Sequence, residues 1–169
     1  MGVDDWAART RDGIMTALTL DTDRQVFFYE QDFYVLSNFS AFTVDWEKHL
    51  FMTAETAYHW EKFIDHPEAQ LEIIRARSAH DAFKIAQNNK DKLSPDWIDQ
   101  RVNVMRRILF AKVSQHEYVR RKLLQTGDRE LIENSWRDDF WGWGPDRDGQ
   151  NMLGKLWMEI RAELSAQSP

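Results

Sequence analysis

The feature that most limits the fold of this chain is a closely spaced series of helix start and stop signals after residue 52. Thr53, Ser78 and Ser94 can each cap a helix, because a hydroxyl accepts a hydrogen bond from a free N–H group of the first turn. Pro67 ends the first helix, and Gly127 supplies the left-handed residue that often follows a helix. These signals predict helices over about 53–65, 67–77, 78–89, 94–115 and 116–126.

A further helix is expected over about 152–164, and its pattern indicates the core. Large apolar residues recur there at helical spacing and share one face: Leu153, Leu156, Trp157, Ile160 and Leu164. Three short strands are expected earlier, where aromatic and β-branched residues are dense: Gln25–Tyr29, Thr43–Asp45 and His49–Phe51. Residues 131–149, which are rich in Trp, Gly and Asp, are expected to form a loop.

The whole pattern predicts an α+β fold, with one predominantly helical domain and a small β element near the N-terminal third. A length of 169 residues suits a single domain. We expect this domain to span residues 25–169. Residues 1–24 show no clear amphipathic period and are expected to form a loosely attached N-terminal arm.

Composition excludes several classes of protein. The chain has no cysteine, so disulfides, thiolate chemistry and cysteine-bound metals are ruled out. A formal charge of −6 argues against general binding of duplex nucleic acid, which requires a basic surplus. No apolar run reaches about 18 residues, so no membrane span is expected. The first residues lack the pattern of a secretory signal, and we expect a cytoplasmic location.

The helix expected from Thr53 carries the first candidate for chemistry. Four reactive side chains share one of its faces at helical spacing: Glu55, Tyr58, His59 and Lys62. A carboxylate, a phenol, an imidazole and an amine on one face suit acid–base catalysis. The pattern also describes a solvated face with a surface Glu–Lys ion pair, and spacing alone favours that second interpretation.

Two further groups of residues suit the binding of a planar, phosphorylated ligand. Trp141 lies between acidic residues and glycines, and Asn151 can cap the last helix, whose N-terminus attracts anions. Alternatively, the tryptophans of this segment fill a hydrophobic gap. Trp97 and Arg101 stand four residues apart and can stack on a base and meet a phosphate, although an ordinary surface cation–π pair has the same spacing. No phosphate-loop, dinucleotide-binding or HExxH motif occurs, so no metal or cofactor is predicted.

Several short motifs in a fixed order connect the chain to a known family. They are Leu36-Ser37-Asn38-Phe39, Glu55-x-x-Tyr58-x-x-x-Lys62-Phe63, Ala82-Phe83-Lys84, Pro95-Asp96-Trp97 with Arg101, Val104-Met105, Thr126-Gly127, Leu131-Ile132-Glu133, Asp139-x-Trp141-Gly142-x-Gly144, Gly149-x-Asn151-x-Leu153-Gly154 and Arg161. Together they resemble the NADAR family, which includes the riboflavin biosynthesis intermediates N-glycosidases. The resemblance covers about residues 26–161.

The resemblance implies a compact, mostly helical α+β fold that hydrolyses the N-glycosidic bond of early phosphorylated riboflavin precursors. Some relatives instead remove ADP-ribose from guanine bases, so the implied partner is a small nucleotide-like substrate. By position, Glu55 and Asp139 match acidic residues of the family. The resemblance also implies substrate-binding positions, with Arg101 and Asn38 expected to meet polar or phosphate groups: Ser37, Asn38, Phe39, Trp97, Arg101, Trp141 and Gly142.

A lysine that forms a Schiff base with an opened ribose is also implied by the resemblance. Lys62 and Lys84 both match lysines of the family, and the motifs do not choose between them. We rank Lys84 slightly ahead, because it lies on a different helix from Glu55 and can approach the sugar from another side. The residues after Glu55 and after Lys84 depart from the usual family pattern, which leaves the choice of substrate open.

The expected chemistry suits these residue types. Cleavage of a ribose C–N bond builds positive charge on the sugar, which a carboxylate stabilises, while an aromatic wall holds the base. A non-catalytic module that binds ADP-ribose or a nucleotide is the main alternative. It would need Trp97, Trp141 and Asn38 but not Glu55. A helical scaffold for protein partners would require an exposed apolar stripe, and none is visible beyond the core faces.

Overall fold

The computed structural model describes residues 20–29 and 32–167. Most of the arm expected at residues 1–24 therefore lies outside the described residues. The described part contains six α-helices, which agrees with the number expected: α2 (Ala54–Glu61), α3 (Pro67–Ile74), α4 (Ala79–Asn88), α5 (Trp97–Gln115), α6 (Glu117–Gln125) and α7 (Met152–Ala166). Two short 3-10 helices, Tyr34–Leu36 and Lys90–Lys92, accompany them.

The strands form two small sheets. β2 (Val44–Trp46) and β3 (His49–Phe51) make an antiparallel hairpin, close to the strands expected there. β1 (Gln25–Phe28) pairs in parallel with β4 (Glu130–Glu133), so that Val26 lies opposite Leu131. The expectation of a loop from residue 131 was wrong at its start, because pairing with a strand far away in the sequence extends these residues. The α+β fold with a small β element is confirmed.

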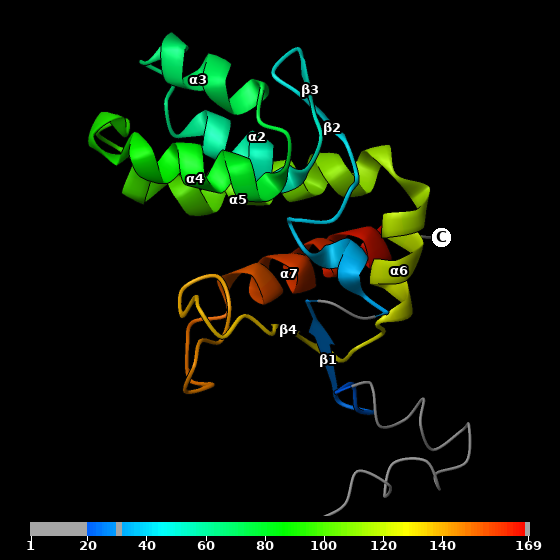
Figure 1. Cartoon of the computed structure of the whole chain (residues 1–169). Coiled ribbons are helices and arrows are strands. Elements are labelled where there is room, and N and C mark those ends of the chain that lie inside the picture. Colours follow the sequence, from blue (N-terminus) through cyan, green and yellow to red (C-terminus); the bar gives the residue numbers. More distant parts are fainter. Residues whose placement is uncertain (1–19, 30–31, 168–169) are drawn as a thin grey trace, which may run out of the picture.

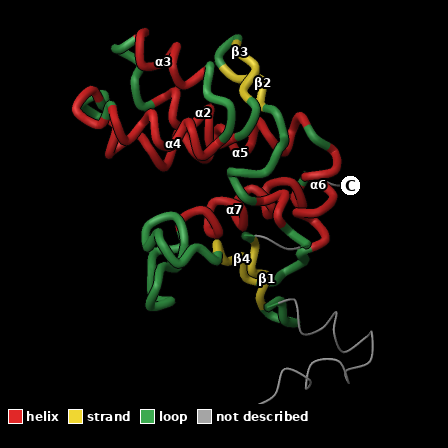
Figure 2. Tube along the Cα trace, viewed as in Figure 1, coloured by secondary structure: helices red, strands yellow, loops and turns green. Residues whose placement is uncertain are grey.

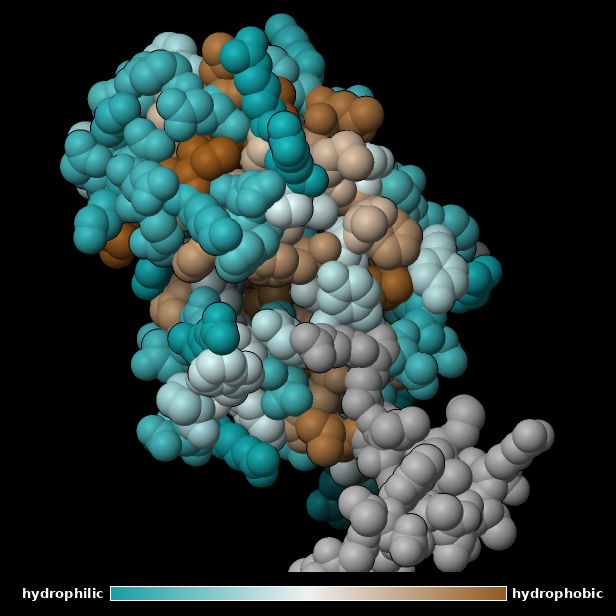
Figure 3. All heavy atoms as spheres, viewed as in Figure 1, coloured by the Kyte–Doolittle hydropathy of each residue, from teal (hydrophilic) through white to brown (hydrophobic). Residues whose placement is uncertain are grey.

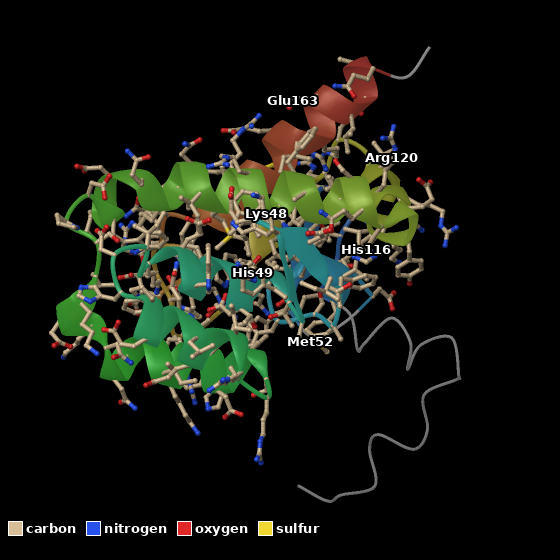
Figure 4. All side chains as sticks on the ribbon, turned by 90° about the horizontal axis from the view of Figure 1, so that it is seen from above. Lys48, His49, Met52, His116, Arg120 and Glu163 are labelled. Carbon is tan, nitrogen blue, oxygen red and sulfur yellow. The ribbon has the colours of Figure 1, made fainter. Side chains whose placement is uncertain are left out.

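The molecule consists of two layers (Figure 1). Helices α2 to α5 and the β2–β3 hairpin form the upper layer, while α7 packs on the β1–β4 pair in the lower layer. Between β4 and α7 the chain runs through a long loop, residues 134–151, at one end of α7 (Figure 2). Helix α5 contacts α7 through ion pairs of Arg106 with Glu159 and with Glu163, which is labelled on α7 in Figure 4.

Helix ends follow the expected caps in two places and differ in two others. The hydroxyls of Thr53 and Ser78 accept hydrogen bonds from the first turns of α2 and α4. Ser94 does not cap α5; its hydroxyl donates to the carbonyl of Lys62 at 3.2 Å, and so ties α5 to the end of α2. Asn151 precedes α7 but makes no side-chain cap there.

The side chain of Asn151 instead pairs with the backbone of β4. Its Oδ1 accepts from the Glu133 N–H at 2.9 Å, and its Nδ2 donates to the Leu131 carbonyl at 2.9 Å. Both bonds are buried, so Asn151 takes the place of a neighbouring strand at the edge of the sheet. Gly154 allows this approach, because a Cβ there would lie 2.0 Å from the Leu131 carbonyl oxygen.

Replacing Asn151 is therefore expected to destabilise the fold in a graded way. Asn151→Gly removes both bonds to β4 but tolerates the backbone φ of 50°, and it should cost about 2–4 kcal/mol in the free energy of unfolding. Asn151→Ala should cost about 1 kcal/mol more, because a left-handed conformation strains alanine. Urea unfolding measures both, with the exposed neighbour Gln150→Ala as control. A glycine variant as stable as the wild type would contradict this role.

Candidate active site

Glu55 stands at the centre of the site, in the first turn of α2. Its backbone N–H donates to the Asn38 carbonyl at 3.1 Å, and its side chain is 12% exposed. Burial by itself raises the pKa of Glu55, but the neighbouring His59, Lys62 and Asn38 outweigh it and bring the pKa below the usual 4.5. The carboxyl group is therefore ionised at neutral pH, although it is largely shielded from water.

His59 lies beside this carboxylate, one turn further along α2. Its Nε2 is 2.7 Å from Oε1 of Glu55, and the side chain is only 2% exposed. Among the described residues, neither ring nitrogen has a partner in good hydrogen-bonding direction, so the contact is a close approach of charge and dipole. Burial lowers the pKa of His59, and the charge of Glu55 acts in the opposite direction. His59 and Lys62 both lower the pKa of Glu55.

A cleft of about 270 Å³ opens at Glu55, and residues of the upper layer and of the loop that follows β4 line it. Its lining combines aromatic, acidic and amide side chains from both layers: Tyr29, Asn38, Phe39, Glu55, Tyr58, His80, Phe83, Glu133, Ser135, Arg137, Asp138, Trp141 and Leu153. A second hollow of about 300 Å³ adjoins it and shares Tyr29 and Phe39. Figure 3 shows less polar side chains gathered between the two strongly hydrophilic layers.

Aromatic rings form one wall of the cleft. The ring of Tyr58 meets Trp141 edge-on at 5.5 Å and Trp97 at 5.0 Å. Trp141 lines the cleft, whereas Trp97 is buried behind Tyr58 and does not line it. Arg101 stacks 3.6 Å above the ring of Phe140 and so supports the loop from outside the lining.

Lys62 lies next to this wall, just past the end of α2. Its Nζ is 4.8 Å from the centre of the Tyr58 ring and 5.8 Å from that of Trp97. Burial lowers the pKa of Lys62 from 10.5 to about 8, while Glu55 acts in the opposite direction. Lys84, on α4, is exposed and does not line the cleft, although Phe83 beside it does. The structure therefore favours Lys62 over Lys84 as the amine of the site.

The structure brings Asp138 rather than Asp139 to the cleft. The Oδ1 atom of Asp138 accepts hydrogen bonds from the N–H groups of Phe140 and Trp141, at 2.9 and 2.7 Å. Asp139 is exposed and does not line the cleft. Asp138 thus holds the backbone that presents Trp141 to the cleft.

Of the remaining predicted positions, Gly142 and Ser37 contribute through the backbone, and two others line the cleft. A Cβ on Gly142 would lie 2.9 Å from the carbonyl oxygen of Glu133, so only glycine allows the loop to pass this close to β4. Ser37 is buried; its carbonyl accepts from Lys112, and the residue lines the second hollow. Asn38 and Phe39 line the main cleft.

The sequence pattern identified some of the residues at the site and missed others. Tyr58 and His59 share the helical face that carries Glu55, and that spacing was sufficient to find them. Glu133 belonged to one of the family motifs but was given no role, because its segment was expected to be a loop. Asp138 was passed over in favour of its neighbour Asp139. His49 and His116, labelled in Figure 4, do not line the cleft; His116 Nε2 lies 2.6 Å from the Thr43 carbonyl.

The described residues offer neither a metal site nor a membrane-spanning helix. No group of three or more His, Asp or Glu side chains in that part of the chain is arranged to hold a metal ion. None of the helices within residues 20–29 and 32–167 is long and apolar enough to cross a membrane.

A shielded carboxylate below an aromatic wall, in a small helical α+β domain, defines a site for a small, partly planar molecule. The model of the NADAR domain matches residues 27–165, and the chain belongs to the NADAR family. It is 31% identical over 147 residues to N-glycosidase YbiA from Escherichia coli, which covers 87% of this chain and 91% of that protein.

Two other comparisons agree with this assignment. The chain is 36% identical over 149 residues to a riboflavin biosynthesis protein from Vibrio vulnificus, but the match spans only 40% of that longer protein. The NMR structure of YbiA from Escherichia coli resembles this fold with a TM-score of 0.78 at 31% identity. That match covers 88% of this chain and 89% of the other.

The contrast between the two adjacent aspartates gives a test of the site. We expect Asp138→Asn to lower kcat/KM by about 10- to 100-fold, because a neutral amide holds the loop less firmly and removes charge from the cleft. The matched variant Asp139→Asn should keep nearly full activity, since this side chain is exposed and lies outside the lining. Steady-state kinetics on a cleaved N-riboside measure both. Equal losses, or a larger loss at Asp139, would contradict the assignment.

Proposed function

We propose that this protein hydrolyses the ribose–nitrogen bond of phosphorylated riboflavin-pathway intermediates or of a related ADP-ribosyl substrate. The reaction class is supported by relatives that carry the name N-glycosidase, so the chain is a hydrolase acting on N-glycosyl compounds. The name of the Vibrio relative, a riboflavin biosynthesis protein, supports the choice of substrate. ADP-ribosylated guanine is the related candidate, since it contains the same kind of bond.

The observation that carries the proposal is the ionised, shielded carboxylate of Glu55 at the cleft. In the transition state, positive charge spreads over the anomeric carbon and the ring oxygen of the ribose. A carboxylate in a site of low dielectric stabilises this charge more strongly than one in water. The same oxygen atoms can take a proton from the water molecule that attacks the sugar.

The lining suits a ribosylated base. Trp141 and Tyr58 offer aromatic surface to the planar ring, and stacking of this kind contributes about 1–3 kcal/mol per base. Arg137 is an exposed cation of the lining and suits a phosphate at the cleft mouth. The volume of about 270 Å³ is near the lower end of small-molecule sites, which fits a base with one sugar.

A direct assay tests the proposal. The purified protein is incubated with phosphorylated ribosylamino-pyrimidines and, separately, with ADP-ribosylated guanosine, and the release of free base is followed. We expect Glu55→Gln to lower kcat by about 10²–10⁴-fold, because glutamine keeps the shape but removes the charge and the proton acceptor. The exposed Glu72→Gln of α3 serves as the control. Near-full turnover by Glu55→Gln on a cleaved substrate would show that Glu55 is structural.

The lowered pKa of Lys62 favours a second route, in which the amine captures the opened sugar as a Schiff base. At a pKa of about 8, roughly a tenth of the lysine is neutral at pH 7. If this second route operates, borohydride reduction during turnover, followed by peptide mapping, places an adduct on Lys62. An adduct on Lys84 would reverse this choice, and active enzyme without an adduct would favour direct hydrolysis.

The alternative is a module that binds ADP-ribose or a nucleotide without cleaving it. Such a module needs the aromatic wall, but gains nothing from an ionised carboxylate held beside an amine. The same assay distinguishes the two functions, because a binding module would saturate with ligand and release no base.

A further inference from the structure

A second buried carboxyl group, that of Glu133, lies in the cleft and has no part in the reaction steps assigned to Glu55. Glu133 is the last residue of β4, in the layer opposite α2. It is only 7% exposed, but it lines the cleft. Its backbone is fully engaged: the N–H donates to Asn151 Oδ1 at 2.9 Å, and the carbonyl accepts from Trp143 N–H at 3.2 Å. The strand end therefore fixes where this side chain stands.

Within the part of the chain that the structure describes, one oxygen of the carboxyl group makes no hydrogen bond that would hold the fold together. This atom, Oε2, is buried and has no hydrogen-bond partner among the described residues. A buried polar atom without a partner is costly, so such an atom in a cleft indicates a group reserved for a ligand. On the other side of the cleft, Glu55 has Asn38, His59 and Lys62 around it. The two carboxyl groups thus share one cleft in very different surroundings.

The charged groups that face Glu133 come from three elements. Glu55 on α2 and Asp138 in the loop are negative, and Lys112 on α5 is positive. Lys112 already donates to the Ser37 carbonyl and to the Ser40 hydroxyl, at 2.9 and 2.8 Å. Burial, with Glu55 and Asp138 adding to it, raises the pKa of Glu133 well above 4.5, and Lys112 only partly opposes this. Glu133 therefore carries a proton under conditions in which Glu55 does not.

We infer that Glu133 is the proton donor to the leaving nitrogen, with Glu55 as its ionised counterpart across the cleft. Two carboxyl groups whose surroundings separate their protonation states are the usual acid–base arrangement of glycoside cleavage. The inference rests on the proposed function, since it assigns the leaving-group side of the same reaction.

The atoms balance in a single hydrolytic turnover. The C1′–N bond breaks, its electron pair goes to the nitrogen, and that nitrogen takes the proton from the Glu133 carboxyl. A water oxygen bonds to C1′ while Glu55 takes one of the water protons. Glu133 ends as a carboxylate and Glu55 as a carboxylic acid, and proton exchange through solvent restores both.

The leaving group provides the sharpest test. Kinetics compare a pyrimidine ribotide with the same compound carrying a nitro group on the ring, whose nitrogen departs without much protonation. We expect Glu133→Gln to lower kcat by about 10²–10⁴-fold on the first and by less than about tenfold on the second. The alkaline limb of the wild-type kcat–pH profile should also disappear. Glu130→Gln is the matched control, because Glu130 lies on the same strand but is exposed and bonds Gln25.

A stability measurement tests the protonated state independently of activity. A carboxyl group whose pKa is raised by folding stabilises the protein below the unfolded pKa of about 4.3, and this contribution is lost as pH rises. The Glu133→Gln variant, which has no such group, should therefore gain stability relative to wild type between pH 5 and pH 8. Urea unfolding at both pH values measures the difference. A difference that does not change with pH would overturn the inference.

The outcomes separate this inference from the proposed function. If the wild type releases no base from any of the ribosides, the proposed function fails. If the wild type is active and Glu133→Gln loses the same factor on both leaving groups, Glu133 has only a structural role. Retained activity of Glu133→Gln on the unactivated ribotide would likewise overturn the inference while leaving the function intact.

Discussion

The arrangement of the cleft depends on one buried ammonium group. Lys112 is fully inaccessible to water, and its Nζ donates to the Ser37 carbonyl and the Ser40 hydroxyl. Burial lowers the pKa of Lys112 from 10.5 to about 7, which shows that its burial is costly. Its two hydrogen bonds hold the segment of residues 36–40 in place. Trp157 on α7 holds the same segment from the other side, because its indole N–H donates to the Leu36 carbonyl at 2.8 Å. The segment thereby joins the two layers.

Because residues 36–40 are held in place, they influence both the position and the pKa of Glu55. Asn38 lies between the residues that Lys112 and Trp157 hold, and its carbonyl accepts the N–H that begins the first turn of α2. The Asn38 amide also helps to lower the pKa of Glu55. A side chain on α5 therefore influences a carboxylate on α2 without touching it. The same lysine opposes the rise in the pKa of Glu133, so it acts on both sides of the cleft, on one by its charge and on the other through the backbone.

Local signals in the sequence were sufficient for the helices and for part of the site. The caps at Thr53 and Ser78 and the apolar face of α7 depend on neighbours within a few residues, and the structure agrees with them. β4 was missed because its stability comes from β1 and from Asn151, which are distant in the sequence or not recognisable as strand partners. The role of Glu133 was missed for the same reason, since β4 brings it to the cleft, and that of Asp138 was missed because only the path of the loop places it there.

The choice between the two lysines depends on tertiary contacts that helical spacing does not reveal. Periodicity extended α2 to about residue 65, which would place Lys62 two turns along a straight helix from Glu55. The helix ends at Glu61, but Lys62 caps it with a right-handed helical backbone and so keeps this spacing. The Lys62 carbonyl accepts from both the backbone and the hydroxyl of Ser94. Ser94 was expected to cap α5 but binds the Lys62 backbone instead. This contact anchors the residue whose ammonium group lies over the ring of Tyr58. Lys84 has no comparable constraint, because the small residues of α4 face the core and leave it on the opposite side.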